Sequence, residues 1–76
     1  MNLSIVVNVT QVGISMDLHG YREDPLILEL IRPAQLTQYR RSLEESNPDM
    51  RYASVGQVAL MLAKRMYPEL PVKLCD

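Results

Sequence analysis

Phenylalanine and tryptophan are missing from this 76-residue chain, although hydrophobic residues make up 47% of it. The interior must therefore be filled by aliphatic side chains, five methionines and four tyrosines. Flexible methionine side chains define a core less sharply than rigid aromatic rings. The chain is also close to the smallest size at which a domain folds without a disulfide, a metal ion or oligomerisation. We expect one domain over residues 1–76, with homodimerisation as one way to bury more surface.

Cysteine is almost as scarce, because Cys75 is the only one. A single cysteine excludes an intrachain disulfide, and with it the framework of small secreted domains. The first four residues lack the positive charge of a signal peptide, and the longest apolar run, Val58 to Ala63, is too short to span a bilayer. These features predict a cytoplasmic protein without a membrane partner.

Residues that carry chemistry are few and scattered. His19 is the only histidine and stands beside Gly20 in an expected loop, while Cys75 stands in the tail without a histidine or helix N-terminus to activate it. The sequence contains no glycine-rich phosphate loop and no calcium-loop pattern. We predict that the chain is not an enzyme and binds neither a metal nor a cofactor.

Charge is nearly balanced in total, at −1, but it is unevenly distributed. Residues 1–31 contain four acids and one arginine, whereas residues 32–65 contain six bases and three acids. Mutual attraction between two packed layers explains this asymmetry better than a dedicated polyanion site. Nucleic acid is therefore a less favoured partner than protein.

The pair Arg40-Arg41 follows Tyr39, an arrangement that superficially resembles a nucleic-acid contact. However, Glu44 and Glu45 lie one helical turn further on and would repel phosphates. They are also spaced for weak ion pairs with the two arginines on a water-exposed helix face. We interpret Arg40 and Arg41 as residues of a solvated helix surface.

The first eighteen residues contain two alternating runs of apolar and polar residues, and the phase changes between the runs. Period-two alternation predicts two strands that each bury one face. A turn at Thr10-Gln11 would oppose Val9 with Val12 and place the apolar side chains of both strands on one face. A turn centred on Val12-Gly13 keeps the same parity and uses the conformational freedom of glycine. One long bulged strand is a third alternative.

A loop from His19 to Pro25 precedes a predicted third strand, from Leu26 to Ile31. Strict alternation in that strand separates two sets of side chains: Leu26, Leu28 and Leu30 on one face, and Ile27, Glu29 and Ile31 on the other.

Residues 33–46 form the first predicted helix. Pro33 is acceptable in a first turn, where its missing N–H has no partner to lose. Leu36, Tyr39 and Leu43 follow at helical spacing and should lie in the core.

Residues 54–67 form the second predicted helix, which begins with a capping box from Ser54 to Gln57. Val58, Leu62 and Met66 are its expected core residues, but apolar side chains extend around much of the helix. Either the sheet and the first helix cover both sides, or one side meets a partner. Residues 68–76 form an extended tail that could add an edge strand.

These elements predict an α+β fold: a small antiparallel hairpin or three-stranded meander from residues 1–31, packed against the two C-terminal helices. The function predicted from this outline is a small intracellular module that binds another protein. Its candidate contact residues come from the two helices: Arg40, Arg41, Met61, Lys64 and Arg65.

One combination of features resembles the small tail assembly chaperones of phages. The matching residues are Pro33, Ala34 and Tyr39 in a helix that follows a strand, with Asn47-Pro48 as the break before a second helix. The resemblance implies a phage-encoded, non-enzymatic protein of the host cytoplasm that shields a tape-measure partner. A compact inhibitor that blocks a host protein surface, like the anti-CRISPR proteins, is the alternative, and a nucleic-acid-binding module is a third hypothesis.

Overall fold

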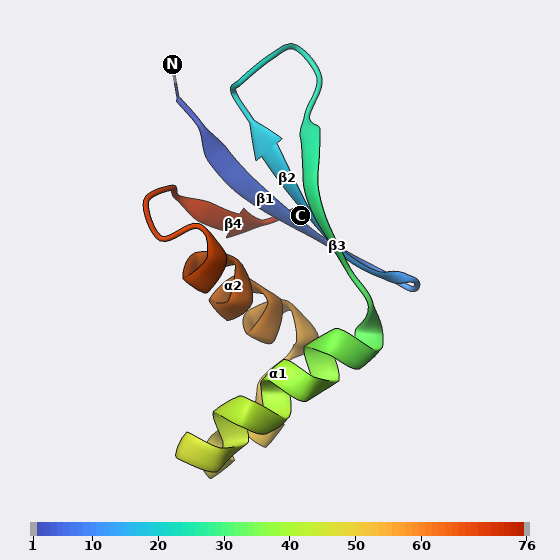
Figure 1. Cartoon of the computed structure of the whole chain (residues 1–76), viewed down its shortest axis with the longest axis vertical. Helices are drawn as coiled ribbons and strands as arrows, with labels where there is room; N and C mark the ends of the chain where they lie inside the picture. Colours follow the sequence, from blue (N-terminus) through green and yellow to red (C-terminus); the bar gives the residue numbers. More distant parts are fainter. Residues whose placement is uncertain (1, 76) are drawn as a thin grey trace.

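The computed structural model describes residues 2–75 as a four-stranded sheet with two α-helices on one face (Figure 1). The elements follow in the order β1 (Ser4–Thr10), β2 (Gly13–His19), β3 (Leu26–Ile31), α1 (Pro33–Ser46), the 3-10 helix η1 (Pro48–Tyr52), α2 (Val55–Met66) and β4 (Val72–Leu74). The strand order is β3-β2-β1-β4, and only β4 runs parallel to its neighbour. The predicted α+β class is confirmed, and a fourth strand makes the sheet mixed.

The first two strands form a hairpin whose turn consists of Gln11 and Val12. Val9 is opposed by Ile14, so the register lies midway between the two predicted turns, and both turn positions were wrong. The parity prediction is confirmed, because odd residues of β1 oppose even residues of β2. The apolar side chains of both strands therefore share the face that the helices cover.

Glycine explains why the turn lies where it does. Gly13 is the first residue of β2 and has a φ of 144°, while every non-glycine residue that the structure describes has a negative φ. A Cβ atom at Gly13 would also collide with the backbone carbonyl of Ile31 at the end of β3. Glycine is thus needed beside the turn, where the end of β3 approaches the hairpin.

The pairing of β3 with β2 contains a β-bulge. Met16 is opposed by Glu29 and Asp17 by Ile27, so Leu28 is an extra residue on β3. The predicted strict alternation of β3 was therefore wrong, because the side chains change phase at Leu28.

The bulge decides which side chains of β3 face the helices. Leu28 and Ile31 pack against the core, and Glu29 is opposed by Met16, which is fully buried. Ile27 and Leu30 instead lie on the open face and are 58% and 70% exposed.

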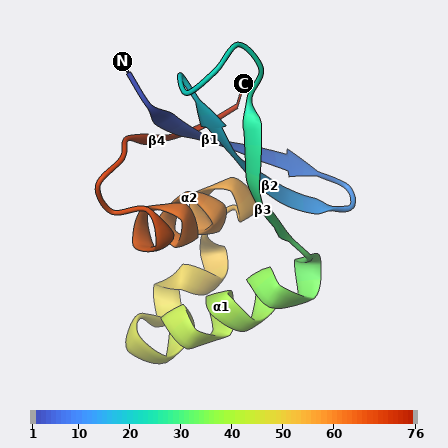
Figure 2. The same cartoon turned by 45° about the horizontal axis from the view of Figure 1, so that its top comes forward.

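The predicted tail is tied to the sheet. The amide of Ile5 donates to the carbonyl of Pro71 at 2.8 Å, and the amide of Cys75 donates to the carbonyl of Val7 at the same distance. Residues 72–74 consequently form β4 beside β1 rather than a detached extension (Figure 2). The alternative of an added edge strand is the correct one.

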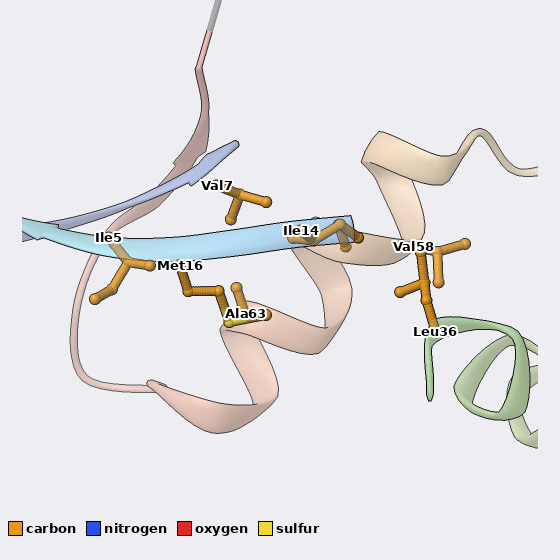
Figure 3. Packing of buried hydrophobic residues seen from close by; sticks show 8 residues of the cluster. Ile5, Val7, Ile14, Met16, Leu36, Val58 and Ala63 are labelled. Atoms are coloured by element: carbon orange, nitrogen blue, oxygen red, sulfur yellow. The ribbon is translucent and has the colours of Figure 1, made fainter. Parts of the chain in front are cut away.

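A single aliphatic cluster joins the sheet to the helices. Figure 3 shows Met16 beside Ala63, and Leu36 beside Val58. The buried members of the cluster are Ile5, Val7, Ile14, Met16, Leu36, Val58, Ala59 and Ala63. Small residues at 59 and 63 let α2 approach the sheet closely.

The predicted core residues are largely confirmed. Leu36 and Val58 are buried, while Tyr39, Leu43 and Leu62 are half-buried against the cluster. The prediction for Met66 was wrong, since this last residue of α2 is 37% exposed. The buried stripe of α2 follows its alanines and leaves the Met66 side chain at the rim.

The helix boundaries agree closely with the predicted ones. α1 spans residues 33–46, with Pro33 in its first turn and the Gln35 Oε1 atom accepting from the Arg32 amide at 2.9 Å. The Ser54 Oγ atom accepts from the Gln57 amide at 3.1 Å and caps α2, which spans 55–66. Neither α-helix combines the length and apolar character needed to cross a bilayer, a statement that covers residues 2–75.

Two aspartate substitutions on α2 test this packing. Val58→Asp places an unpaired charge in the core, at a cost of several kcal/mol that is comparable with the stability of a small domain. We expect this variant to unfold. Met66→Asp should cost far less, on the order of 1 kcal/mol, because the side chain lies at the rim and the new charge meets only the negative end of the helix dipole. Urea denaturation followed by circular dichroism measures both, and similar losses in the two variants would contradict the assigned face of α2.

Candidate interaction surface

One edge of the sheet is formed by β3, which is twice as long as the opposite edge strand, β4. An edge strand has N–H and C=O groups on its outer side that can bind another strand. Proteins commonly protect such edges with charged residues, proline or β-bulges. The only charged residue of β3 is Glu29, and Pro25 stands just before the strand. The bulge at Leu28 and the inward-facing charge of Glu29 protect the edge in part, and the other residues of β3 are apolar.

Exposed apolar side chains adjoin this edge. Ile27 and Leu30 project from the open face of β3, and Val12 in the hairpin turn is 85% exposed. Between the turn and β3 lies a hollow of about 570 Å³, to which these three residues contribute. We call the outer edge of β3 together with the side chains of Val12, Ile27 and Leu30 the β3 surface.

The middle of the open face is polar or already covered. Val6 is 5% exposed and lies between Asp17 on β2 and Lys73 on β4. The Asn8 Nδ2 atom donates to the Asp17 Oδ2 atom at 2.6 Å. The other oxygen of Asp17, Oδ1, is buried and has no hydrogen-bond partner within residues 2–75. Exposed apolar area on this face therefore gathers at β3.

On the opposite face, Glu29 lies near the end of α2. Burial raises the pKa of the Tyr67 phenol, and the negative charge of Glu29 raises this pKa further. Tyr67 packs against the core and directly follows α2. Glu29 therefore borders the helix layer, consistent with its position opposite Met16.

A second hollow of about 310 Å³ separates the hairpin end from the helices. Its walls are largely apolar and include Val9, Leu36 and Val55. Thr37 and Arg40 supply polar groups. This cleft is smaller than the hollow beside β3, and it borders no sheet edge that could add a strand.

The structure corrects the interpretation of Arg40. Its Nη1 atom donates to three backbone carbonyls: Ala53 at 2.7 Å, Met50 at 3.3 Å and Arg51 at 3.4 Å. This nitrogen carries two N–H groups, so one of them is shared between two of the converging carbonyls at the end of η1. Arg40 thus fastens α1 to the connection that leads into α2, and it is not a solvated partner of Glu44.

The other predicted contact residues lie on two helices. Arg41 is exposed on α1, Lys64 and Arg65 are exposed in the last turn of α2, and Met61 is half-buried. The side chain of Arg40 is held by η1, so the five do not form one exposed patch. A contact between the remaining four and a partner stays a prediction.

Sequence reasoning missed the β3 surface because strict alternation separates Ile27 from Leu30. The leucine-rich strand with apolar residues on both faces was the available signal. The position of the bulge depends on pairing with β2, which a local pattern does not encode.

The residues predicted to lack catalytic roles lie at the ends of strands. His19 is the last residue of β2, and Cys75 follows β4. Within residues 2–75, no group of three histidine, cysteine, aspartate or glutamate residues is arranged to hold a metal ion.

Comparison of this chain with known protein families, curated proteins and solved structures gives no match. The resemblance to phage tail assembly chaperones therefore stays a prediction.

Neighbouring arginines on α1 provide a test of the assigned roles. Arg40→Ala removes the donor of three carbonyl hydrogen bonds, and we expect it to lower the free energy of unfolding by roughly 1–3 kcal/mol. Arg41→Ala should change it by less than about 0.5 kcal/mol, because that side chain is exposed. Urea denaturation compares the two variants, and equal effects would contradict the structural role of Arg40.

Proposed function

We propose that this chain is a small, non-enzymatic protein-interaction module that binds by adding a strand to β3. The observation that carries the proposal is the apolar edge strand LILELI, with the exposed side chains of Ile27 and Leu30 beside it. In this mode of recognition, backbone hydrogen bonds provide affinity and side-chain contacts provide specificity.

The side chains of the β3 surface can supply a substantial part of the binding free energy. Complete burial of an aliphatic side chain contributes about 1.5–3 kcal/mol. Since more than half of the Ile27 and Leu30 side-chain surface is accessible, covering both should contribute on the order of 3 kcal/mol. Association costs several kcal/mol in lost freedom, so the backbone hydrogen bonds of an added strand are also needed.

The lining of the hollow beside β3 favours binding over catalysis. Its polar side chains are Thr10, Ser15 and Arg32, and the rest of its lining is aliphatic or glycine. A hydroxyl nucleophile needs an adjacent base to activate it, and none of these side chains provides one. The chaperone and the inhibitor suggested by the sequence are both special cases of a protein-binding module.

Photo-crosslinking in the native host, followed by mass spectrometry, tests the proposal. A benzophenone amino acid at the exposed position 12 reacts with C–H bonds, so the number of lysines does not affect the readout. Ile27→Lys/Leu30→Lys places two charges on the β3 surface, and we expect it to remove most protein crosslinks made by the wild-type chain. Both positions are exposed, so the melting temperature should stay close to that of the wild type.

Lys64→Glu/Arg65→Glu is the matched control, because it changes two exposed residues on α2. This control should keep the wild-type crosslinks. Crosslinks that survive the lysine substitutions but disappear in the control would contradict a site on β3 and favour the helix surface.

A further inference from the structure

We propose that the strand which β3 accepts is β3 of a second copy, in an antiparallel pairing about a two-fold axis. This inference rests on the proposed function and names the partner of the same surface. The pairing would join two four-stranded sheets into one continuous sheet.

The spacing of the exposed residues allows two copies of β3 to match each other's apolar side chains. In a regular strand, side chains on one face are two or four positions apart. The bulge at Leu28 places Ile27 and Leu30 on one face although they are three positions apart. A regular strand can oppose both residues, as β2 does with Ser15 and Asp17, and a second β3 can oppose them with its own Ile27 and Leu30.

One register between two copies of β3 brings these apolar residues together. When Leu28 is opposed by the partner's Glu29, Ile27 is opposed by the partner's Leu30, and Leu30 by the partner's Ile27. Opposed side chains lie about 4.5–5.5 Å apart between Cβ atoms, so the exposed apolar residues of both copies would pack together. Residues that face the helices in one copy oppose residues that face the helices in the other.

Charges at the strand ends are complementary in this register. Acidic Asp24 precedes β3 and basic Arg32 follows it, and both are exposed. Antiparallel pairing brings Asp24 within one position of the partner's Arg32. The two-fold axis repeats this contact at the other end of the seam, and parallel pairing would instead align like charges.

One feature opposes the pairing. Glu29 lies one position from the partner's Glu29, close to the two-fold axis, and the two carboxylates repel each other. Self-association should therefore be reversible and sensitive to this residue.

Cysteine pairs test the register directly, in a Cys75→Ser background because Cys75 is exposed. Ile27→Cys and Leu30→Cys are made in separate chains, mixed, and oxidised mildly. We expect disulfide-linked dimers in the mixture and little linkage in either variant alone. The expected register opposes position 27 with position 30, whereas identical positions lie roughly 8–10 Å apart along the seam, beyond disulfide reach.

Strong linkage of either variant alone would overturn this register. A wild-type chain that light scattering shows to be monomeric, together with no linkage in the mixture, would overturn self-pairing altogether. The proposed function would survive that result if Ile27→Lys/Leu30→Lys still removed crosslinks to another protein.

Removal of the Glu29 charge, which repels the same residue of the partner, should strengthen the dimer. Glu29→Gln is expected to lower the dimer dissociation constant roughly two- to fivefold in sedimentation equilibrium. Glu45→Gln on α1 removes the same charge at an exposed position and should leave the constant within twofold. Equal effects of the two substitutions, or weaker association of Glu29→Gln, would contradict the placement of the axis.

Discussion

The pairing of β3 with β2 contains one residue more on β3 than on β2, and the exposed surface of the domain depends on that difference. With Leu28 as the extra residue, Ile31 turns to the helices while Ile27 and Leu30 turn away from them. In a regular strand, one face would carry Leu26, Leu28 and Leu30, and the other would carry Ile27, Glu29 and Ile31. The bulge instead collects exposed apolar residues beside a strand edge, where backbone groups are also available.

The aliphatic core is small, and this leaves apolar area exposed on the open face of the sheet. The chain has no phenylalanine or tryptophan to fill a second layer. The 12-residue α2 packs on β1 and β4, and the 14-residue α1 packs mainly on η1 and α2. Ala59 and Ala63 bring α2 close to the sheet, and the hydrogen bonds of Arg40 fasten α1 to η1. These contacts hold α2 against the sheet and α1 against η1. The β3 side of the open face keeps exposed apolar area that strand addition would cover.

Much of the fold could be predicted from the sequence, because it is encoded by local patterns. Pro33 and Ser54 mark the starts of the helices, and alternation in residues 3–18 assigns the buried face of the hairpin. The details that failed depend on distant contacts. Glycine is required at position 13 because the Ile31 backbone approaches it closely. The bulge depends on the register between β2 and β3. The role of Arg40 depends on carbonyls ten to thirteen residues further along the chain.

Contact between the Ile27 and Leu30 methyl groups of two chains is the most direct test of the account. An isotope-filtered NOE experiment on a mixture of labelled and unlabelled protein detects only contacts between chains. The account predicts intermolecular NOEs between these two residues, since they oppose each other across the seam. Intermolecular NOEs confined to α2, or none at a concentration where the protein is dimeric, would contradict it.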